Sequence, residues 1–451
     1  MYDTICAIST SPSSAISIIR VSGDNAIEIT NKIFKGKDLN KVNSHTINYG
    51  FIHDNEEIID EVLVSVMKKP KTYTKEDVVE INTHGGIAPT NKTLELLLIN
   101  GARIAEPGEF TKRAYLNGRI DLLEAEAIMD MINSKTEKER NMAINQIKGK
   151  TSNLIDDLRS DLIELISNIN VNIDYPEYDD IEEITNNKTI PILKKVKEKA
   201  EIILKESKNG QMIKDGISTT IIGKPNVGKS SLLNALLEEE KAIVTNIPGT
   251  TTDIVEGEIL INGIKLNLKD TAGIRTSKNE IERIGIKKSK ESIKNSDLIL
   301  YMLNNNEEIN KETIELLKTI KDKNYLILIN KIDLENKLDL NKLDIDKDKI
   351  IFLSIVNNQG IDKLKERIIK MFSINEIIQK EAIYLSDIRS ISILKSSLNK
   401  INSLLDNINN IPIDMIEMEL KIIWEEIGKI NGKTYEEELL DEMFKRFCLG
   451  K

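Results

Sequence analysis

The stretch that decides the fold is GKPNVGKS, from Gly223 to Ser230, which fits the pattern G-x-x-x-x-G-K-[ST]. The residues before it (STTIIG) indicate a strand, and the residues after it (SSLLNALL) indicate a helix. A strand–loop–helix unit directs backbone N–H groups and a helix N-terminus at phosphate oxygens. We therefore predict a phosphate loop in which Lys229 reaches the β- and γ-phosphates and Ser230 ligates Mg²⁺. The alternative, a chance glycine-rich turn, is disfavoured by the flanking strand and helix.

Two elements expected of a nucleotide switch follow in chain order. The stretch PGTTTDIVEG (248–257) supplies threonines that can close over the metal and the γ-phosphate, and we predict Thr251 as the ligand. The stretch LNLKDTAGI (266–274) places Asp270 at the end of a predicted strand, where it can hold water on the metal. Gly273 then offers a backbone N–H to the γ-phosphate.

The identity of the base follows from YLILINKID (325–333), a third strand that ends with Asn330, Lys331 and Asp333. The Asp333 carboxylate can accept from N1–H and from the exocyclic amine of guanine. Adenine lacks that donor pair and would leave the carboxylate unpaired. Asn330 suits the O6 and N7 side of the base. Ser354 is expected near the base, although Ile355 after it is larger than usual.

The ordered set predicts a GTP-binding domain. The predicted GTP-binding residues are Asn226, Val227, Gly228, Lys229, Ser230, Ser231, Thr245, Asn246, Ile247, Pro248, Gly249, Thr250, Thr251, Asp270, Thr271, Ala272, Gly273, Asn330, Lys331, Asp333 and Ser354.

Two catalytic groups common in GTPases are missing. The position after D-x-x-G, where a water-orienting Gln often stands, is Ile274, and residues 245–253 contain no arginine. Another group must orient water, and another positive charge must stabilise the transition state. A monovalent cation held by Asn226 and by carbonyls of residues 245–250 could supply that charge. Glu282 is a candidate for orienting water, although its spacing alone favours a solvated helix face.

Composition is that of a globular protein. At 451 residues the chain is long enough for two to four domains. Two cysteines and three histidines make neither a disulfide framework nor a zinc site. No signal peptide and no apolar run of about 20 residues stands out, so we expect a cytoplasmic protein with no membrane span. The net charge of −10 does not indicate RNA binding, although a local basic face could still bind RNA.

The sequence divides into four segments that differ in their predicted secondary structure. Residues 1–117 mix short strands and helices, which predicts an α+β domain. Residues 118–212 and 375–451 show helical periodicity, and residues 213–374 alternate strand and helix. This order favours one helical domain with an inserted α/β domain over two separate helical bundles.

The chain resembles a known family along nearly its whole length. The matching stretches are SIIRVSG, TYTKEDVVEINTHGG, ARIAEPGEFTKRAYLNGRIDLLEAEA, GKPNVGKSSLLNAL, AIVTNIPGTT, DTAGIR, IERIG and the terminal CLGK. They resemble the bacterial and organellar tRNA uridine-5-carboxymethylaminomethyl modification GTPases, called MnmE or TrmE. The nucleotide motifs are shared by many GTPases, whereas the N-terminal and C-terminal stretches are specific to this family.

The resemblance implies a multidomain α/β and α fold: an N-terminal α+β domain that dimerises and binds folate, a central helical domain, and an inserted Ras-like P-loop GTPase domain. It implies a homodimer that forms a heterotetramer with an FAD-containing partner of the MnmG (GidA) type. Together they would add a carboxymethylaminomethyl-type group at C5 of the wobble uridine (U34) of certain tRNAs. The implied cofactors are GTP, Mg²⁺, K⁺ and a tetrahydrofolate derivative, either 5-formyl or 5,10-methylene.

The resemblance also implies roles for particular residues. Ser230 and Thr251 would hold Mg²⁺, and Glu282 would be the catalytic, water-orienting residue. The K⁺ ligands would be Asn226, Thr245, Ile247 and Thr250. The folate ligands would be Arg20, Glu80, Arg119 and Lys451. Without the resemblance, Arg20, Glu80 and Arg119 would pass for solvated surface charges.

Departures from the family pattern leave alternatives open. Thr252 stands where the family usually has Arg, which would leave K⁺ with more of the charge stabilisation. Arg119 stands where Lys is common, so a planar guanidinium, which can make two parallel hydrogen bonds, replaces a compact ammonium group. The alternative function is a regulatory GTPase switch in ribosome assembly. Such a switch would have no reason to carry the folate-type stretches. A catalytically dead scaffold is disfavoured because the nucleotide residues are present.

Overall fold

A computed structural model gives the arrangement of the chain. It describes residues 3–11, 14–174, 189–239, 257–270, 293–340, 343, 345–375, 385–434, 443–445, 447 and 450. The chain divides into two compact units. One comprises residues 1–133, 143–201 and 388–451, and the other comprises residues 134–142 and 202–387. Each unit is described by itself below.

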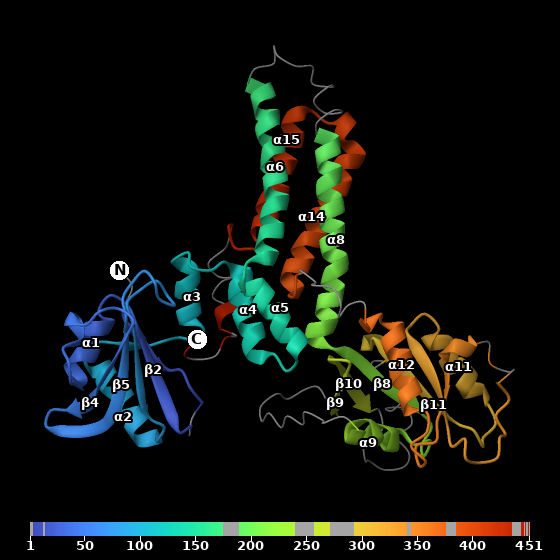
Figure 1. The fold of residues 1–451 in the computed structure, drawn as a ribbon. Coiled ribbons are helices and arrows are strands. Elements are labelled where there is room, and N and C mark those ends of the chain that lie inside the picture. The colour runs from blue at the N-terminus through green and yellow to red at the C-terminus, as the bar shows by residue number, and fades with distance from the viewer. Residues whose placement is uncertain are drawn as a thin grey trace, which may run out of the picture. The chain divides into compact units, whose positions relative to one another are not determined.

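A seven-stranded sheet begins the first unit (Figure 1). Its order is β3-β4-β5-β6-β2-β1-β7, and its strands are β1 (Ile5–Ile8), β2 (Ile16–Ser22), β3 (Phe34–Lys35), β4 (Thr46–Asp54), β5 (Glu57–Met67), β6 (Val78–His84) and β7 (Arg103–Ile104). Helices α1 (Ala26–Ile33) and α2 (Ile87–Ile99) pack against it. Alternate strand residues such as Ile19, Val64 and Ile81 are fully buried in the shared core, which confirms the predicted α+β fold.

Helices form most of the remaining described part of the first unit. They are α3 (Glu109–Leu116), α4 (Leu122–Asn133), α6 (Lys150–Asp174), α14 (Ile388–Asn407) and α15 (Ile413–Gly428), and two further helices, α5 (Glu137–Ile147) and α8 (Ile190–Asp215), cross the division between the units. On α6 the apolar residues spaced along one face are buried, from Leu158 to Ile169, although Leu154 at the start of this face is only half-buried. Thus segments from both ends of the sequence share one helical bundle, since α15 contacts both α6 and α14.

The apolar residues of α14 do not all face the bundle. Leu394 and Ile401 are fully buried, whereas Ile391, Leu398 and Leu405 are only half-buried, and the serines at 390 and 397 are fully buried. Ser397 Oγ donates to Glu426 Oε2 of α15 at 3.4 Å. The buried face of α14 therefore includes small polar side chains, one of which hydrogen-bonds to α15, and apolar periodicity does not reveal such residues.

The second unit contains a six-stranded sheet of order β13-β12-β11-β8-β10-β9. Its elements are β8 (Ile217–Gly223), α9 (Lys229–Glu239), β9 (Gly257–Ile261), β10 (Ile264–Asp270), β11 (Leu298–Asn304), α11 (Lys311–Ile320), β12 (Tyr325–Asn330), β13 (Ile350–Phe352) and α12 (Ile361–Met371). All neighbouring strands are parallel except β9, which runs antiparallel to β10. This is a Ras-like sheet. The first strand, β8, lies in its middle, at the switch point where α/β folds bind ligands.

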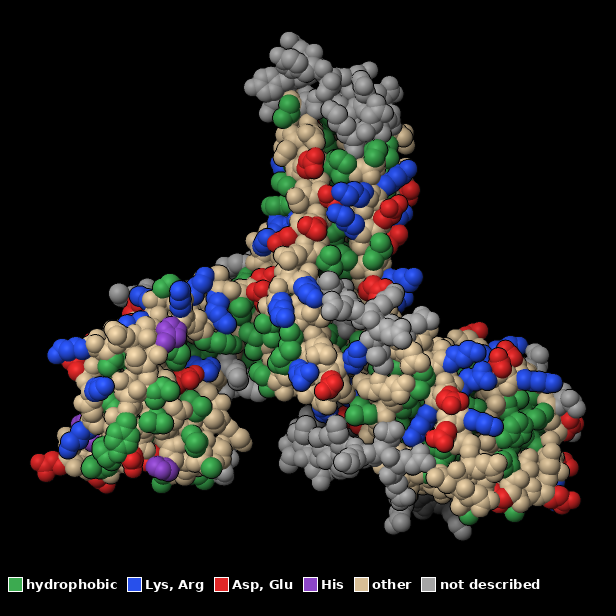
Figure 2. Space-filling view, viewed as in Figure 1, with side chains coloured by type: hydrophobic (Ala, Val, Ile, Leu, Met, Phe, Trp, Pro, Cys, Tyr) green, Lys and Arg blue, Asp and Glu red, His purple; other side chains and the backbone are tan. Residues whose placement is uncertain are grey.

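Surface charge on the long helices is mixed. Figure 2 shows acidic and basic side chains interspersed along α6 and α8. Lys195 and Lys199 of α8 both reach the Asp161 carboxylate of α6, at 3.1 and 2.6 Å. The lysine-rich run of α8 therefore makes ion pairs within the bundle, at least in part, rather than forming an open basic face. Among the helices that the structure describes, none combines the length and apolarity needed to cross a bilayer.

Candidate functional site

The phosphate loop joins β8 to α9, as the sequence predicts. Gly228 has a φ of +103°, in the left-handed region that favours glycine. A Cβ atom at this position would lie 2.5 Å from Asn330 Nδ2. The loop therefore needs glycine at residue 228 for its backbone shape and for the close approach of Asn330.

Lys229 opens α9 and folds back over the loop. Its ammonium donates to the carbonyl oxygens of Gly223 and Lys224, each at 2.9 Å, and the residue is 9% exposed. These carbonyls hold the charge close to the loop backbone, within reach of the space that the α9 N-terminus faces. The predicted contact of Lys229 with the β- and γ-phosphates is compatible with this position.

The residues after β12 contact the phosphate loop directly. Asn330 Nδ2 donates to the Val227 carbonyl at 2.8 Å, and its Oδ1 accepts from Ile355 N at 3.4 Å. Lys331 Nζ donates to the Asn226 carbonyl at 3.1 Å. The two predicted motifs, about 100 residues apart in sequence, are thus brought together. Asn330 and Lys331 also brace the loop, a role that sequence reasoning missed.

Asp333 is oriented by Ser354. The Ser354 hydroxyl, which is fully buried, donates to Asp333 Oδ1 at 2.6 Å. Ser354 is itself fixed by backbone hydrogen bonds with Gln359. Among the described residues, none donates a hydrogen bond to Asp333 Oδ2. One carboxylate oxygen is therefore held by Ser354, while the other can accept hydrogen bonds from a base. This arrangement gives Ser354 a concrete role in presenting Asp333.

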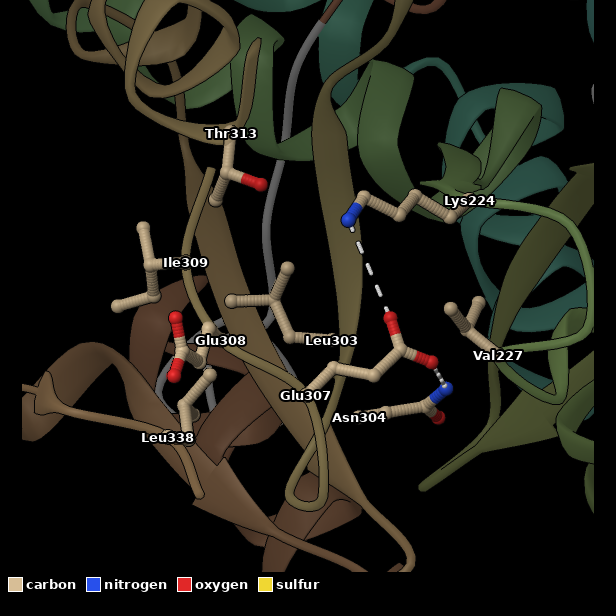
Figure 3. A pocket seen from close by; sticks show the side chains of 9 residues that line it. All are labelled: Lys224, Val227, Leu303, Asn304, Glu307, Glu308, Ile309, Thr313 and Leu338. Atoms are coloured by element: carbon tan, nitrogen blue, oxygen red, sulfur yellow. Dashed lines mark hydrogen bonds and ion pairs between the residues drawn. The ribbon is translucent and has the colours of Figure 1, made fainter. Parts of the chain in front are cut away.

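An acidic side chain lies beside the outer part of the loop. Glu307 receives a hydrogen bond from Asn304 at the end of β11, and its other oxygen lies 3.9 Å from Lys224 Nζ (Figure 3). A small pocket beside the loop is lined by these three side chains together with Val227 and others (Figure 3). Lys224 and Glu307 are both substantially exposed, so this ion pair contributes little to stability.

The metal positions are described only in part. Ser230 lies exposed in the first turn of α9. Strand β10 ends at Asp270, whose backbone pairs with Ile221 near the C-terminal end of β8. Asp270 and the phosphate loop that follows β8 therefore lie at the same end of these parallel strands. Hydroxyl and carboxylate oxygens are donors that suit Mg²⁺. Among described residues no cluster of three or more His, Cys, Asp or Glu could hold a metal. The predicted residues Thr245, Asn246, Ile247, Pro248, Gly249, Thr250, Thr251, Thr271, Ala272, Gly273, Glu282 and Lys451 lie outside the described part of the chain.

In the N-terminal sheet, Arg20 of β2 and Glu80 of β6 stand directly opposite each other. Arg20 Nε and Nη2 lie 2.9 and 2.8 Å from Glu80 Oε1, and Arg20 Nη1 lies 3.4 Å from the Gly450 carbonyl. The C-terminal end of the chain is thus held beside two predicted folate residues. Ser9 Oγ donates to the same carbonyl at 3.0 Å. A side chain at Gly450 would meet the backbone of residues 8 and 9.

Tyr73 joins the third predicted folate residue to this group. The Arg20 guanidinium lies 5.2 Å from the centre of the Tyr73 ring, and that of Arg119 lies 4.7 Å from it. Arg119 Nη1 also donates to the Tyr73 carbonyl at 3.0 Å. The structure therefore brings Arg20, Glu80 and Arg119 around one ring. Sequence reasoning missed Tyr73, and the only available signal was an aromatic residue in the stretch TYTKEDVVE.

The sheet order, the phosphate loop and the Asn330–Asp333 motif together define a P-loop GTPase domain of the Ras-like class, a GTP hydrolase. Residues 4–119 match the family model for the N-terminus of the GTP-binding protein TrmE, and residues 122–448 match that for the MnmE helical domain. Curated relatives are similar over their full length. The chain is 47% identical to the tRNA modification GTPase MnmE of Bacillus mycoides (strain KBAB4) and 48% identical to that of Bacillus licheniformis, with 100% of each chain covered.

The chain therefore belongs to the MnmE (TrmE) family of tRNA modification GTPases. Among solved structures, the chain is similar to the G domain of the FeoB iron transporter of T. maritima, which is 26% identical, with 35% of this chain and 98% of that chain covered and a TM-score of 0.26. The family assignment rests on the family models and the full-length relatives.

Proposed function

We propose that this protein is a K⁺-dependent GTPase that modifies the wobble uridine (U34) of certain tRNAs. It would act in the cytoplasm as a homodimer, together with an FAD-containing partner of the MnmG type, and add a carboxymethylaminomethyl-type group at C5 using a folate one-carbon donor. One observation carries the proposal: a single chain holds both a Ras-like guanine-nucleotide site and the cluster of Arg20, Glu80 and Arg119. The domain limits 1–117, 118–212, 213–374 and 375–451 are part of the proposal.

The chemistry of the cluster suits a folate. Arg20 Nε and Nη2 both contact Glu80 Oε1, and among the described residues none donates a hydrogen bond to Glu80 Oε2. That oxygen can accept from the amine and amide donors of a pterin ring. The exposed guanidinium of Arg119 can bind a glutamate carboxylate in a bidentate manner. Lys451, adjacent in sequence to the anchored Gly450, would add a third cation.

The phosphate loop offers an oxygen donor for a monovalent cation. Asn226 has a φ of +61° and an exposed side chain, while its carbonyl accepts from Lys331. The side-chain amide oxygen is a hard donor of the kind that K⁺ and Mg²⁺ sites use. With Thr245, Ile247 and Thr250 it would hold K⁺, whose charge would stabilise the transition state. Ser230 and Thr251 would hold Mg²⁺, and Glu282 would orient water.

The N-terminal sheet supports the proposed homodimer. Ile47 and Tyr49 of β4 and Leu63 of β5 are 69%, 59% and 46% exposed, and Tyr49 pairs directly with Leu63. A group of exposed apolar side chains on adjacent strands is typical of an interaction surface. A second copy of the chain would bury this surface.

The test of the GTPase part measures GTP hydrolysis in KCl and in NaCl at equal ionic strength. We expect K⁺ to raise the rate about tenfold or more, equivalent to about 1.4 kcal/mol of barrier, and Asn226→Ala to abolish that gain. Asn262→Ala is a matched control, because Asn262 is also an exposed asparagine with positive φ in the same unit. Equal rates in the two salts would contradict the K⁺ mechanism and favour the alternative, a regulatory switch in ribosome assembly.

The folate part is tested separately by calorimetric titration with 5-formyltetrahydrofolate. Arg20→Gln and Glu80→Gln should each weaken binding while leaving GTP hydrolysis unchanged. Absence of folate binding by the wild type would remove the feature that distinguishes the tRNA-modifying enzyme from the assembly switch.

A further inference from the structure

The loop that carries Tyr73 is fixed at several points. Thr74 O accepts from Asn117 Nδ2 at 2.7 Å, and Lys75 Nζ donates to the Gly118 carbonyl at 2.8 Å. The Tyr73 hydroxyl lies 2.9 Å from Thr111 Oγ1. Each contact joins residues 73–75 to α3 or to the turn that follows it, which leads directly to Arg119. The ring of Tyr73 therefore has a fixed position relative to the backbone of Arg119.

A buried ion pair between Glu76 and Arg113 anchors this loop to α3. Glu76 is 9% exposed and Arg113 is 3% exposed, and Arg113 Nη1 lies 3.1 Å from Glu76 Oε1. Glu76 Oε2 also accepts from the Ser22 hydroxyl of β2 at 2.7 Å. Ser22 is two residues from Arg20 on the same strand, so one carboxylate ties together the strand that bears Arg20 and the loop that bears Tyr73.

The two guanidiniums lie close enough to repel each other. Because their distances to the ring centre add, the guanidinium carbons of Arg20 and Arg119 lie within about 10 Å of each other. Like charges at that separation disfavour each other, whereas the face of an aromatic ring attracts a cation. Glu80 forms its ion pair with Arg20, whereas Arg119 interacts with the Glu124 carboxylate only through space, without a described ion pair. The ring is the contact that the two cations share.

We propose that Tyr73 is a positioning residue: its ring holds Arg20 and Arg119 at a fixed spacing, so that they bind an anionic folate as one unit. This inference rests on the proposed folate function. Arg20, paired with Glu80, would face the heterocycle. Arg119, whose remaining N–H groups face solvent, would bind the glutamate carboxylate. Preorganisation of the two side chains lowers the entropy lost on binding.

The experiment uses the full-length protein and calorimetric titration with 5-formyltetrahydrofolate. Tyr73→Leu should weaken binding roughly tenfold, the size expected when cation–ring contacts are lost from two partly exposed arginines. Tyr73→Phe should keep wild-type affinity, because it retains the ring. Thr111→Val is the matched control, since it removes the hydroxyl partner of Tyr73 and leaves the ring in place. Thermal unfolding of each variant shows whether the domain stays folded.

Coupling to Arg119 separates a positioning role from a merely structural one. In an Arg119→Gln background, Tyr73→Leu should cause a much smaller further loss, because one of its two cations is gone. The effect of Arg119→Gln should shrink for a ligand without any carboxylate, 5-formyl-6-methyltetrahydropterin, while that of Glu80→Gln should persist.

The outcomes distinguish the inference from the function beneath it. If the wild type binds no 5-formyltetrahydrofolate, the folate function is overturned and the inference with it. If Arg20→Gln loses binding and Tyr73→Leu does not, only the inference is overturned. If Tyr73→Phe loses as much affinity as Tyr73→Leu, the ring is not the operative group and the inference is also overturned.

Discussion

Replacing Gly228 by alanine should disable nucleotide binding without unfolding the GTPase domain. Two costs follow from the structure. A side chain at a φ of +103° costs about 1–2 kcal/mol. The new Cβ would lie 2.5 Å from Asn330 Nδ2 and so displace it from the buried carbonyl of Val227, which costs about 1–3 kcal/mol.

The two costs sum to about 2–5 kcal/mol if the loop keeps its shape. The loop can avoid them only by giving up the conformation that presents its N–H groups to phosphate. Because about 1.4 kcal/mol is a factor of ten, the dissociation constant for GDP should rise about 30-fold or more. The assay is titration with a fluorescent guanine nucleotide, alongside circular dichroism to confirm that the domain is folded.

A matched control shares the strain but lies away from the loop. Gly216, between α8 and β8, has a φ of +78°, and a Cβ there would lie 2.7 Å from the Lys265 carbonyl. Gly216→Ala should lower the thermal midpoint and leave GDP affinity per folded molecule unchanged. The reasoning is refuted if Gly228→Ala binds GDP within threefold of wild type, or if Gly216→Ala weakens GDP binding equally.

Three further substitutions test other contacts. Ser354→Ala should weaken GTP binding roughly tenfold, because a hydrogen bond to the charged Asp333 is worth about 1.5–3 kcal/mol. A competition assay in which the affinities for GTP and ATP change equally would contradict this prediction. Glu76→Ala should lower the free energy of unfolding of the N-terminal domain, which urea unfolding would measure. Loss of a buried ion-pair partner costs about 3–5 kcal/mol, and we expect a loss near or below the low end because Arg113 keeps Asp3 and Glu109. Burial raises the pKa of Asp161, but hydrogen bonds from two lysines of α8 outweigh it and hold that pKa below its ordinary value of 3.8. The ion pairs therefore stabilise the bundle above about pH 4 and are lost as the pH falls through the lowered pKa. The difference in thermal midpoint between wild type and Asp161→Asn should accordingly be present at neutral pH and shrink as the pH falls below about 4, and a difference that stays constant from neutral pH into acid would count against the pairs.

The GTPase domain was the part most readily predicted, because its signals are local. A phosphate loop needs glycine where the backbone has positive φ, and it needs a strand before it and a helix after it. All three appear within about 25 residues around Gly228. The predicted positions of Asp270 and Asn330 at strand ends were also confirmed. Hydrophobic periodicity was less reliable on α14, because two buried serines occupy the face that packs in the bundle.

The N-terminal site shows the opposite case. Its residues are spread from Ser9 to Gly450, and no local pattern marks Arg20 or Arg119 as anything but surface charges. Only the resemblance to the family singled out Arg20, Glu80 and Arg119, and it did not include Tyr73.

By itself the sequence determined the nucleotide, the order of the motifs and the α/β character of the second unit. These depend on backbone conformation and on residue chemistry that a short segment carries with it. Only the tertiary structure decided which charges meet. Strand pairing sets Arg20 opposite Glu80, the Arg119 side chain lies over the Tyr73 ring, and the Gly450 carbonyl reaches both Ser9 and Arg20. Such contacts join residues up to 441 positions apart, and their partners are fixed by sheet register and helix packing, which only the complete fold specifies.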